Sequence, residues 1–235
     1  MVLSESEMVE GSLHIKYRKN YRYSLFDAYL RAIARAAEKE NKSLRDFRIL
    51  DLGCGRGEFL EYAVANGIAL LEGVDFDPVC VEMSSKYAKC YRADITTVDE
   101  VLEGKGYDLI LASHVIEHLQ DPRNTIEMLL PFAKYFVIAV PNPLRPNVIF
   151  YAMKRYNYSN LGHYYAWDRS HFTIFIRKCG LEIIDYYVDD VRLPSNRVVN
   201  ALRRRRMLGG LERTILAKLF PYFSTSLIVL CSMSE

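Results

Sequence analysis

The feature that most constrains this chain is a glycine-rich loop placed directly after an apolar run. Residues 48–52 read RILDL, and Asp51–Phe59 reads DLGCGRGEF, with glycines at 53, 55 and 57. Such glycines allow a sharp turn and let backbone N–H groups approach a ligand at the start of the next helix. A short buried strand, this loop and a following helix predict the first unit of an α/β fold whose ligand lies at the carboxyl end of the strand.

Apolar runs and helical patterns then alternate along the chain. The runs that predict strands are RILDL (48–52), ALLEGV (69–74), 90–93, YDLILA (107–112), YFVIAV (135–140), LEIIDYYV (181–188) and SLIVLC (226–231). The patterns that predict helices are Tyr23–Ala37, Glu58–Asn66, Pro78–Lys86, Pro122–Lys134 and Phe172–Cys179. Strict alternation of strand and helix predicts a parallel sheet that is covered by helices on both faces.

Composition is consistent with one domain. The 235 residues are 50% hydrophobic, enough for one sizeable core, and five scattered cysteines form no C-x-x-C pair. No apolar run reaches the ~20 residues of a membrane span, and the N-terminus MVLSESEMVEGS is polar. We therefore expect a cytoplasmic protein without a transmembrane segment. The net charge of +2 indicates no particular partner.

A nicotinamide dinucleotide is the first alternative ligand for the glycine loop. The dinucleotide fingerprint G-x-G-x-x-G, counted from Gly53, would place its third glycine at the position of Glu58. A glutamate behind the loop would repel a pyrophosphate, whereas Asp51 in front of it could accept hydrogen bonds from a cationic ligand. The loop therefore disfavours a nicotinamide oxidoreductase.

Four motifs in order resemble the class I S-adenosylmethionine-dependent methyltransferases. DLGCGRG resembles motif I of that family, GVDFDP (73–78) its second-strand motif, YRADI (91–95) its third, and YDLILASHVIEHLQDP (107–122) the fourth strand of its broad small-molecule (type 11/23-like) branch. The resemblance is close over residues 46–141. It implies a Rossmann-like, seven-stranded, mainly parallel sheet whose last strand is antiparallel. It also implies a single domain over 1–235, with an N-terminal helical cap (1–42), a cofactor-binding core (46–141), a lid insertion (142–171) and a basic insertion (190–222).

The same resemblance implies a cofactor site for S-adenosyl-L-methionine. In the family pattern Asp75 binds the ribose hydroxyls, Asp94 takes the adenine amino group, Ile95 packs on the ring, and Ser113 and His114 line the methionine end. The full set of expected cofactor-binding residues is Asp51, Gly53, Cys54, Gly55, Gly57, Asp75, Phe76, Asp94, Ile95, Ser113 and His114.

The stretch SHVIEHLQDP contains a second pattern, because His114, Glu117 and His118 match the H-x-x-E-H zinc-ligand motif of one metalloprotease class. We expect no metal, since a third ligand at suitable spacing is not evident and the motif follows a strand of an open sheet. If the acceptor is a hydroxyl, His114 or His118 is the best-placed general base. His118 as a structural cap of the following turn is the alternative.

The four motifs do not identify the methyl acceptor, so the segments outside them must recognise it. SHVI stands where amino-methyltransferases of adenine and cytosine carry [D/N]-P-P-[Y/F], so the expected acceptor is a small molecule, attacked at oxygen. The aromatic and irregular segment 145–171 resembles the family's substrate lid. Its candidates for substrate contact, or alternatively for packing onto the sheet, are His163, Tyr164, Tyr165, Trp167 and His171; Tyr17, Tyr21 and Tyr23 are candidates to close over the cofactor.

Arg203, Arg204, Arg205 and Arg206 form a basic run before an amphipathic stretch in which Leu211, Ile215, Leu216 and Leu219 share a face. A solvated helix surface is the simplest interpretation of the run. The alternative is that the run binds RNA or, at a peripheral membrane contact, an anionic lipid headgroup. RNA ranks below a small-molecule acceptor, because no added nucleic-acid module is evident. A cofactor-binding regulatory protein without turnover is the alternative of another class.

Overall fold

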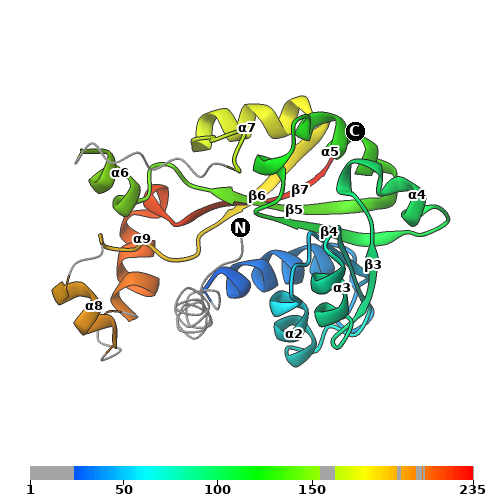
Figure 1. Ribbon diagram of the computed structural model, residues 1–235, viewed down its shortest axis with the longest axis horizontal. Coiled ribbons are helices and arrows are strands. Elements are labelled where there is room, and N and C mark those ends of the chain that lie inside the picture. The colour runs from blue at the N-terminus through cyan, green and yellow to red at the C-terminus, as the bar shows by residue number, and fades with distance from the viewer. Residues whose placement is uncertain (1–23, 154–161, 195–196, 205–207, 209, 235) are drawn as a thin grey trace, which may run out of the picture.

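The computed structural model describes residues 24–153, 162–194, 197–204, 208 and 210–234 (Figure 1). These residues form one seven-stranded sheet in the order β3-β2-β1-β4-β5-β7-β6. The strands are β1 (Ile49–Leu52), β2 (Leu71–Asp75), β3 (Lys89–Arg92), β4 (Tyr107–Ser113), β5 (Ala133–Pro141), β6 (Leu181–Tyr187) and β7 (Ser226–Met233). Each strand expected from the sequence is therefore confirmed within a few residues.

The direction of the strands also matches the expectation. β3, β2, β1, β4 and β5 are parallel to one another, while β7 pairs antiparallel with β5 on one side and with β6 on the other. The register of β6 against β7 shifts between Ile183 and Asp185, which marks a bulge. The Rossmann-like mixed sheet with an antiparallel last strand is confirmed.

Helices cover both faces of the sheet (Figure 1). One face packs against α4 (Asp99–Leu102), α5 (Pro122–Leu129) and α7 (Arg169–Lys178). The N-terminal helix (residues 24–39), α2 (Glu58–Ala65) and α3 (Pro78–Ser84) lie on the opposite face. Strands buried on both faces explain why their sequences read as continuous apolar runs.

Local chemistry sets the helix ends. Asp77 and Asp121 cap α3 and α5 through their side chains, and each is followed by a proline at the first helical position. The helix expected over Pro122–Lys134 ends earlier, at Leu129, and continues as a 3₁₀ turn over Leu130–Phe132. Pro131 explains this difference, because a proline has no backbone N–H to donate to the carbonyl four residues earlier and its ring clashes with that carbonyl.

Further helices lie beyond the carboxyl ends of β4 and β5 (Figure 1). Segment 145–171 was expected to be irregular, but its first part is α6 (Pro146–Met153). The basic insertion holds α8 (Arg197–Arg204), a π-helix over Leu211–Leu216 and α9 (Ala217–Leu219). No helix in the described part of the chain is long and apolar enough to cross a membrane.

Candidate active site

The glycine loop joins β1 to α2 and has left-handed backbone at all three glycines, with φ of 73° at Gly53, 54° at Gly55 and 81° at Gly57. An added Cβ at Gly53 would lie 2.5 Å from Val115 Cγ2, and one at Gly57 would lie 2.8 Å from the Cα of Ser84. These two positions need glycine for packing as well as for conformation. Gly55 differs, because a Cβ there would meet no atom within 4 Å. The loop therefore presents its open surface at Gly55.

Asp75 at the end of β2 supports this loop. Its Oδ2 accepts a hydrogen bond from the Gly55 N–H at 2.8 Å, and its Oδ1 accepts one from the Asp77 N–H at 3.0 Å. The carboxyl group is thereby held at the loop, 7% exposed. The neighbouring Phe76 leaves 70% of its surface exposed, an unusual state for a phenyl ring beside such a loop.

Asp51 lies in the interior below the loop. It is 3% exposed, and burial, with smaller contributions from Cys90 and Asp75, raises the pKa of its carboxyl group to about 8. The protonated form is therefore favoured at neutral pH, and a cation bound nearby would favour the ionised form instead. Cys54 packs its thiol into the core beside Gly73, so its side chain takes no part in the open loop surface.

The residues after β3 lie against the same loop. Asp94 caps the 3₁₀ turn Ile95–Thr97, and hydrogen bonds first from the backbone N–H and then from the hydroxyl of Thr96 lower the pKa of its carboxyl group. Ile95 is buried, and its Cδ1 would lie 3.7 Å from a Cβ on Gly53. An apolar surface thus borders the loop beside an exposed carboxylate.

Ser113 and His114 end the adjacent strand β4. Ser113 Oγ shares a 2.6 Å hydrogen bond with the hydroxyl of Tyr29 from the N-terminal helix, and burial raises the pKa of that hydroxyl well above its usual value. His114 has a left-handed backbone with φ of 56°, which is uncommon outside glycine and is found at functional sites. Its Nε2 lies 3.2 Å from Ser226 Oγ, and its Nδ1 lies 3.4 Å from Glu117 Oε1.

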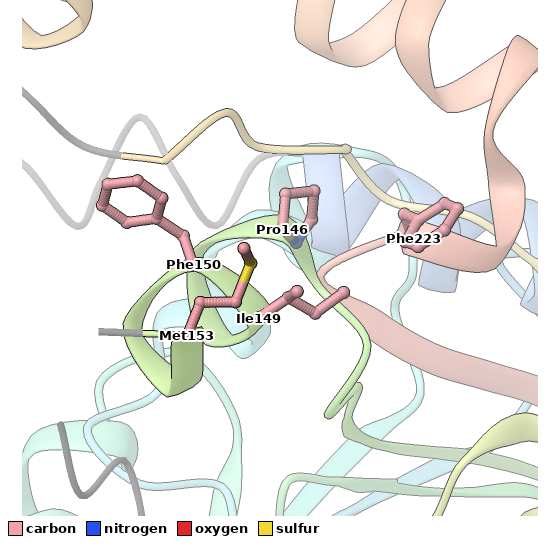
Figure 2. A pocket seen from close by; sticks show the side chains of 5 residues that line it. All are labelled: Pro146, Ile149, Phe150, Met153 and Phe223. Atoms are coloured by element: carbon pink, nitrogen blue, oxygen red, sulfur yellow. The ribbon is translucent and has the colours of Figure 1, made fainter. Parts of the chain in front are cut away.

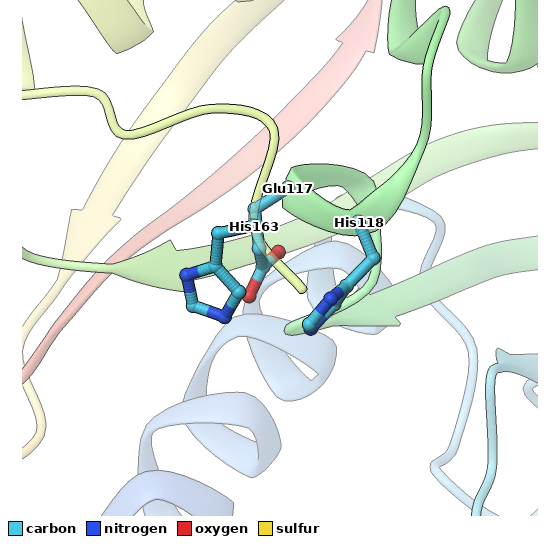
Figure 3. Close-up of side chains that lie close together, drawn as sticks. All are labelled: Glu117, His118 and His163. Carbon is cyan, nitrogen blue, oxygen red and sulfur yellow. The ribbon is translucent and has the colours of Figure 1, made fainter. Parts of the chain in front are cut away.

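The next turn brings the lid segment onto β4. His118 Nδ1 is 2.8 Å from the carbonyl oxygen of Gly162, while the carbonyl of Glu117 accepts from the Tyr164 N–H at 2.8 Å. His163 consequently lies beside His118, with ring centroids 4.5 Å apart (Figure 3). Burial lowers the pKa of His163, although Glu117 opposes this effect. Asp121, rather than His118, caps α5; His118 instead joins the lid to the turn.

The lid aromatics divide into a packed group and an exposed group. Trp167 is buried and stacks on Tyr165 with centroids 5.1 Å apart, and it also contacts Phe172 and Phe175. It therefore packs the lid onto α7, which is the alternative considered for it. Tyr164 is largely exposed, and His171 is paired with Asp168 on the surface of α7.

Several predicted features lie wholly or partly outside the described residues. Tyr17, Tyr21 and Tyr23 belong to the undescribed N-terminal segment, and Arg205 and Arg206 fall in another gap; Arg203 and Arg204 belong to α8. Of the apolar face that follows, Ile215 and Leu219 are exposed.

Sequence reasoning missed Tyr29 and Ser226 as neighbours of the β4 end, and it gave Glu117 no role. Only the H-x-x-E-H pattern signalled Glu117. Nothing in the spacing of Tyr29 or Ser226 could have placed them there, because each joins the site by a contact of high sequence separation.

An apolar pocket of about 330 Å³ lies on α6, the helix that follows β5. It is lined by Pro146, Ile149, Phe150, Met153 and Phe223 (Figure 2). Four of these residues come from α6, and the fifth precedes β7. The pocket is open to solvent and is lined almost wholly by apolar atoms, so it suits a hydrophobic ligand portion.

Known proteins resemble this chain in sequence and in fold. The model of the methyltransferase domain family matches residues 17–186. A ubiquinone biosynthesis O-methyltransferase of Rhizobium etli (strain CIAT 652) is 34% identical over 91 residues, which is 36% of this chain and 36% of that protein. A second strain, CFN 42, has such an enzyme with 34% identity over 90 residues. The aligned region thus spans about a third of the length of these curated relatives.

Solved structures extend the likeness to nearly the whole chain. Magnesium protoporphyrin IX methyltransferase from Synechocystis PCC 6803 with bound S-adenosylhomocysteine superposes with a TM-score of 0.60 at 15% identity, covering 93% of this chain and 87% of that one. The plantazolicin methyltransferase in complex with a triazolic desmethylPZN analogue and S-adenosylhomocysteine superposes with a TM-score of 0.63 at 14% identity, covering 94% of this chain and 90% of that one. Since the family match extends over well over half of the sequence, the chain belongs to the methyltransferase domain family, and it has the fold of class I S-adenosylmethionine-dependent methyltransferases.

Proposed function

We propose that this chain transfers a methyl group from S-adenosylmethionine to a hydroxyl oxygen of a small molecule that has an apolar portion. The observation that carries the proposal is the group of imidazoles at the carboxyl end of β4, where His114 and His118 lie beside the buried carboxylate of Glu117. A hydroxyl acceptor must lose a proton, and imidazole is the side chain best suited to accept one near neutral pH.

The residues of the glycine loop fit the cofactor. Gly55 provides open space for close approach, Asp75 is fixed beside it for the ribose hydroxyls, and Ile95 offers an apolar contact for the adenine ring. Asp94 lies next to Ile95 with an exposed carboxylate for the adenine amino group, and the exposed ring of Phe76 borders the same space. Asp51 would balance the positive charge of the ligand by ionising.

Bound S-adenosylmethionine supplies an electrophilic sulfonium methyl group, so the protein needs chiefly to orient the acceptor, exclude water and take one proton. Ser113 and His114 would border the methionine end, with Ser113 held by Tyr29. His118 keeps a lone pair on Nε2, because its Nδ1 must be the protonated nitrogen that donates to the carbonyl of Gly162. His118 and His114 are therefore the two candidates for the general base.

The pocket on α6 supports an acceptor with an apolar portion. The 34% identical relatives named ubiquinone biosynthesis O-methyltransferase support oxygen as the attacked atom, within the third of their length that aligns. The coarse function, methyl transfer from S-adenosylmethionine, follows from the family; the hydroxyl and the apolar portion are the parts proposed here.

The experiment uses the full chain with S-adenosylmethionine carrying a labelled methyl group. A panel of phenols and catechols, with and without alkyl substituents, is compared with matched anilines and thiols. We expect labelled methyl ethers, formed more efficiently with the alkylated phenols. A His118→Gln variant, with His171→Gln as a matched control, should lose turnover while keeping its affinity for S-adenosylhomocysteine. Methylation of nitrogen acceptors alone would contradict the proposal.

A further inference from the structure

Three side chains at the β4 turn and the lid bring potential metal-ligating atoms together. One carboxylate oxygen of Glu117 and one ring nitrogen each of His118 and His163 lie within 4.8 Å of one another. Figure 3 shows the carboxylate of Glu117 between the two imidazole rings. His163 is the third ligand that the spacing of H-x-x-E-H did not reveal, since it lies on the lid, far along the chain.

The state of Glu117 is the second observation. Its side chain is 1% exposed, and neither carboxylate oxygen has a hydrogen-bond partner among the described residues. His114 Nδ1 lies within ion-pairing distance of Oε1, at 3.4 Å, but the contact does not meet hydrogen-bond geometry. A buried carboxylate without hydrogen bonds is costly and calls for a cation. The rings on both sides of it make a metal ion a better fit than a proton alone.

The histidine tautomer also suits a metal. His118 donates its Nδ1–H to the carbonyl of Gly162, which leaves the lone pair of Nε2 available. Ligating histidines commonly donate their second N–H to a backbone carbonyl in this way. The bonds from the N–H groups of Tyr164 and Tyr165 to the carbonyl of Glu117, at 2.8 and 3.4 Å, fix the lid on the same turn. The three ligands are therefore positioned by backbone contacts that need no ion.

We propose that Glu117, His118 and His163 bind one divalent first-row transition-metal ion. Two imidazoles and one carboxylate suit zinc or manganese rather than magnesium or calcium, which prefer oxygen ligands alone. Three protein ligands leave positions open for a water or a substrate oxygen. If the proposed oxygen methylation holds, an acceptor hydroxyl on the ion would lose its proton more readily. Because Nε2 of His118 would then bind the ion, His114 would be the base that accepts this proton. That role rests on the proposed function, whereas metal binding itself does not.

The test measures metal binding directly, without acceptor. The full chain is stripped with chelator and titrated with Zn²⁺, Mn²⁺ and Mg²⁺ by calorimetry, and its metal content after desalting is measured by elemental analysis. We expect one Zn²⁺ or Mn²⁺ per chain and no comparable binding of Mg²⁺. His163→Gln should weaken the binding at least tenfold, because it removes one of the three ligands. His171→Gln, also a lid-side histidine but paired with Asp168, is the matched control and should bind as wild type does.

Two results would overturn the proposal. The first is the absence of stoichiometric binding of either transition metal by the wild-type chain; the second is equal binding by wild type and His163→Gln. Affinity for S-adenosylhomocysteine, measured on the same samples, checks that each variant is folded. Should His163→Gln bind this ligand poorly, His118→Asn takes its place. A chain that binds metal but methylates no oxygen acceptor would refute the proposed function and leave the metal site in place.

Discussion

Replacing Gly55 with alanine separates the ligand-binding role of the glycine loop from its role in the fold. Gly55 has φ of 54°, so an alanine there adopts a left-handed conformation that costs about 1–2 kcal/mol. No atom lies within 4 Å of the added Cβ, so packing adds no further cost. For a chain of this size the melting temperature should fall by roughly 2–8 °C.

The effect of Gly55→Ala on the cofactor should be larger than its effect on stability. Its methyl group would fill the open face of the loop, beside the carboxyl group of Asp75 that holds the Gly55 N–H. We expect the dissociation constant for S-adenosylmethionine, measured by calorimetry, to rise at least tenfold, or about 1.4 kcal/mol.

Gly104→Ala is the matched control for this experiment. Gly104 has φ of 70° and equally open surroundings, but it precedes the amino end of β4, whereas the glycine loop follows the carboxyl end of the parallel strand β1. It should lower the melting temperature by a similar amount and leave cofactor affinity unchanged. If Gly55→Ala bound S-adenosylmethionine within twofold of wild type, the open face of the loop would not be the ligand surface and the reasoning would be refuted.

Three further predictions follow from the strand ends and the basic run. Asp75→Ala should weaken S-adenosylmethionine binding by roughly 1.5–3 kcal/mol, the cost of removing a charged hydrogen-bond acceptor, and calorimetry within twofold of wild type would remove Asp75 from the site. Asp51→Asn should raise the melting temperature of the ligand-free protein above pH 8, and raise it much less near pH 4. Folding raises the pKa of the Asp51 carboxyl group to about 8, so the stability associated with its protonated form is present at low pH and is lost as the pH rises through that value. An asparagine cannot ionise and therefore avoids this loss. Replacing Arg203–Arg206 with glutamine should leave the Michaelis constant of the acceptor and its salt dependence unchanged if the run is only solvated. If the run binds an RNA acceptor, the slope of log affinity against log salt concentration should fall by about 0.7–0.9 for each phosphate contact that is lost.

The sequence predicted the strands well because burial on both faces leaves a direct trace in composition. YFVIAV is apolar at every position and RILDL at Ile49, Leu50 and Leu52, as expected for strands that are covered by helices on both faces. The sequence also predicted the glycine loop correctly. In the structure a Cβ at Gly53 or Gly57 would clash with its neighbours, so these positions require glycine. α6 was missed because its apolar residues stand among prolines and aromatics without a clear helical period.

The histidine cluster was only half visible in the sequence. His114, Glu117 and His118 stood out by their spacing, but the approach of His163 depends on backbone hydrogen bonds between the lid and the β4 turn. Likewise the burial of Glu117 depends on what packs around it, and glutamate is ordinarily a surface residue. Such contacts arise from tertiary structure, so local patterns carry no signal of them.

The position of β7 between β5 and β6 has a consequence for how the chain folds during its synthesis. β7 is the last of the seven strands to leave the ribosome, yet it lies between β5 and β6 and hydrogen-bonds with both. Until it emerges, β6 has no strand to join, and the edge of β5 is exposed to other nascent chains. Ser226, at the start of β7, also contacts His114, so the β4 end of the site is completed only at this final step. A message truncated before codon 226 should therefore yield an aggregation-prone chain rather than a partly active enzyme.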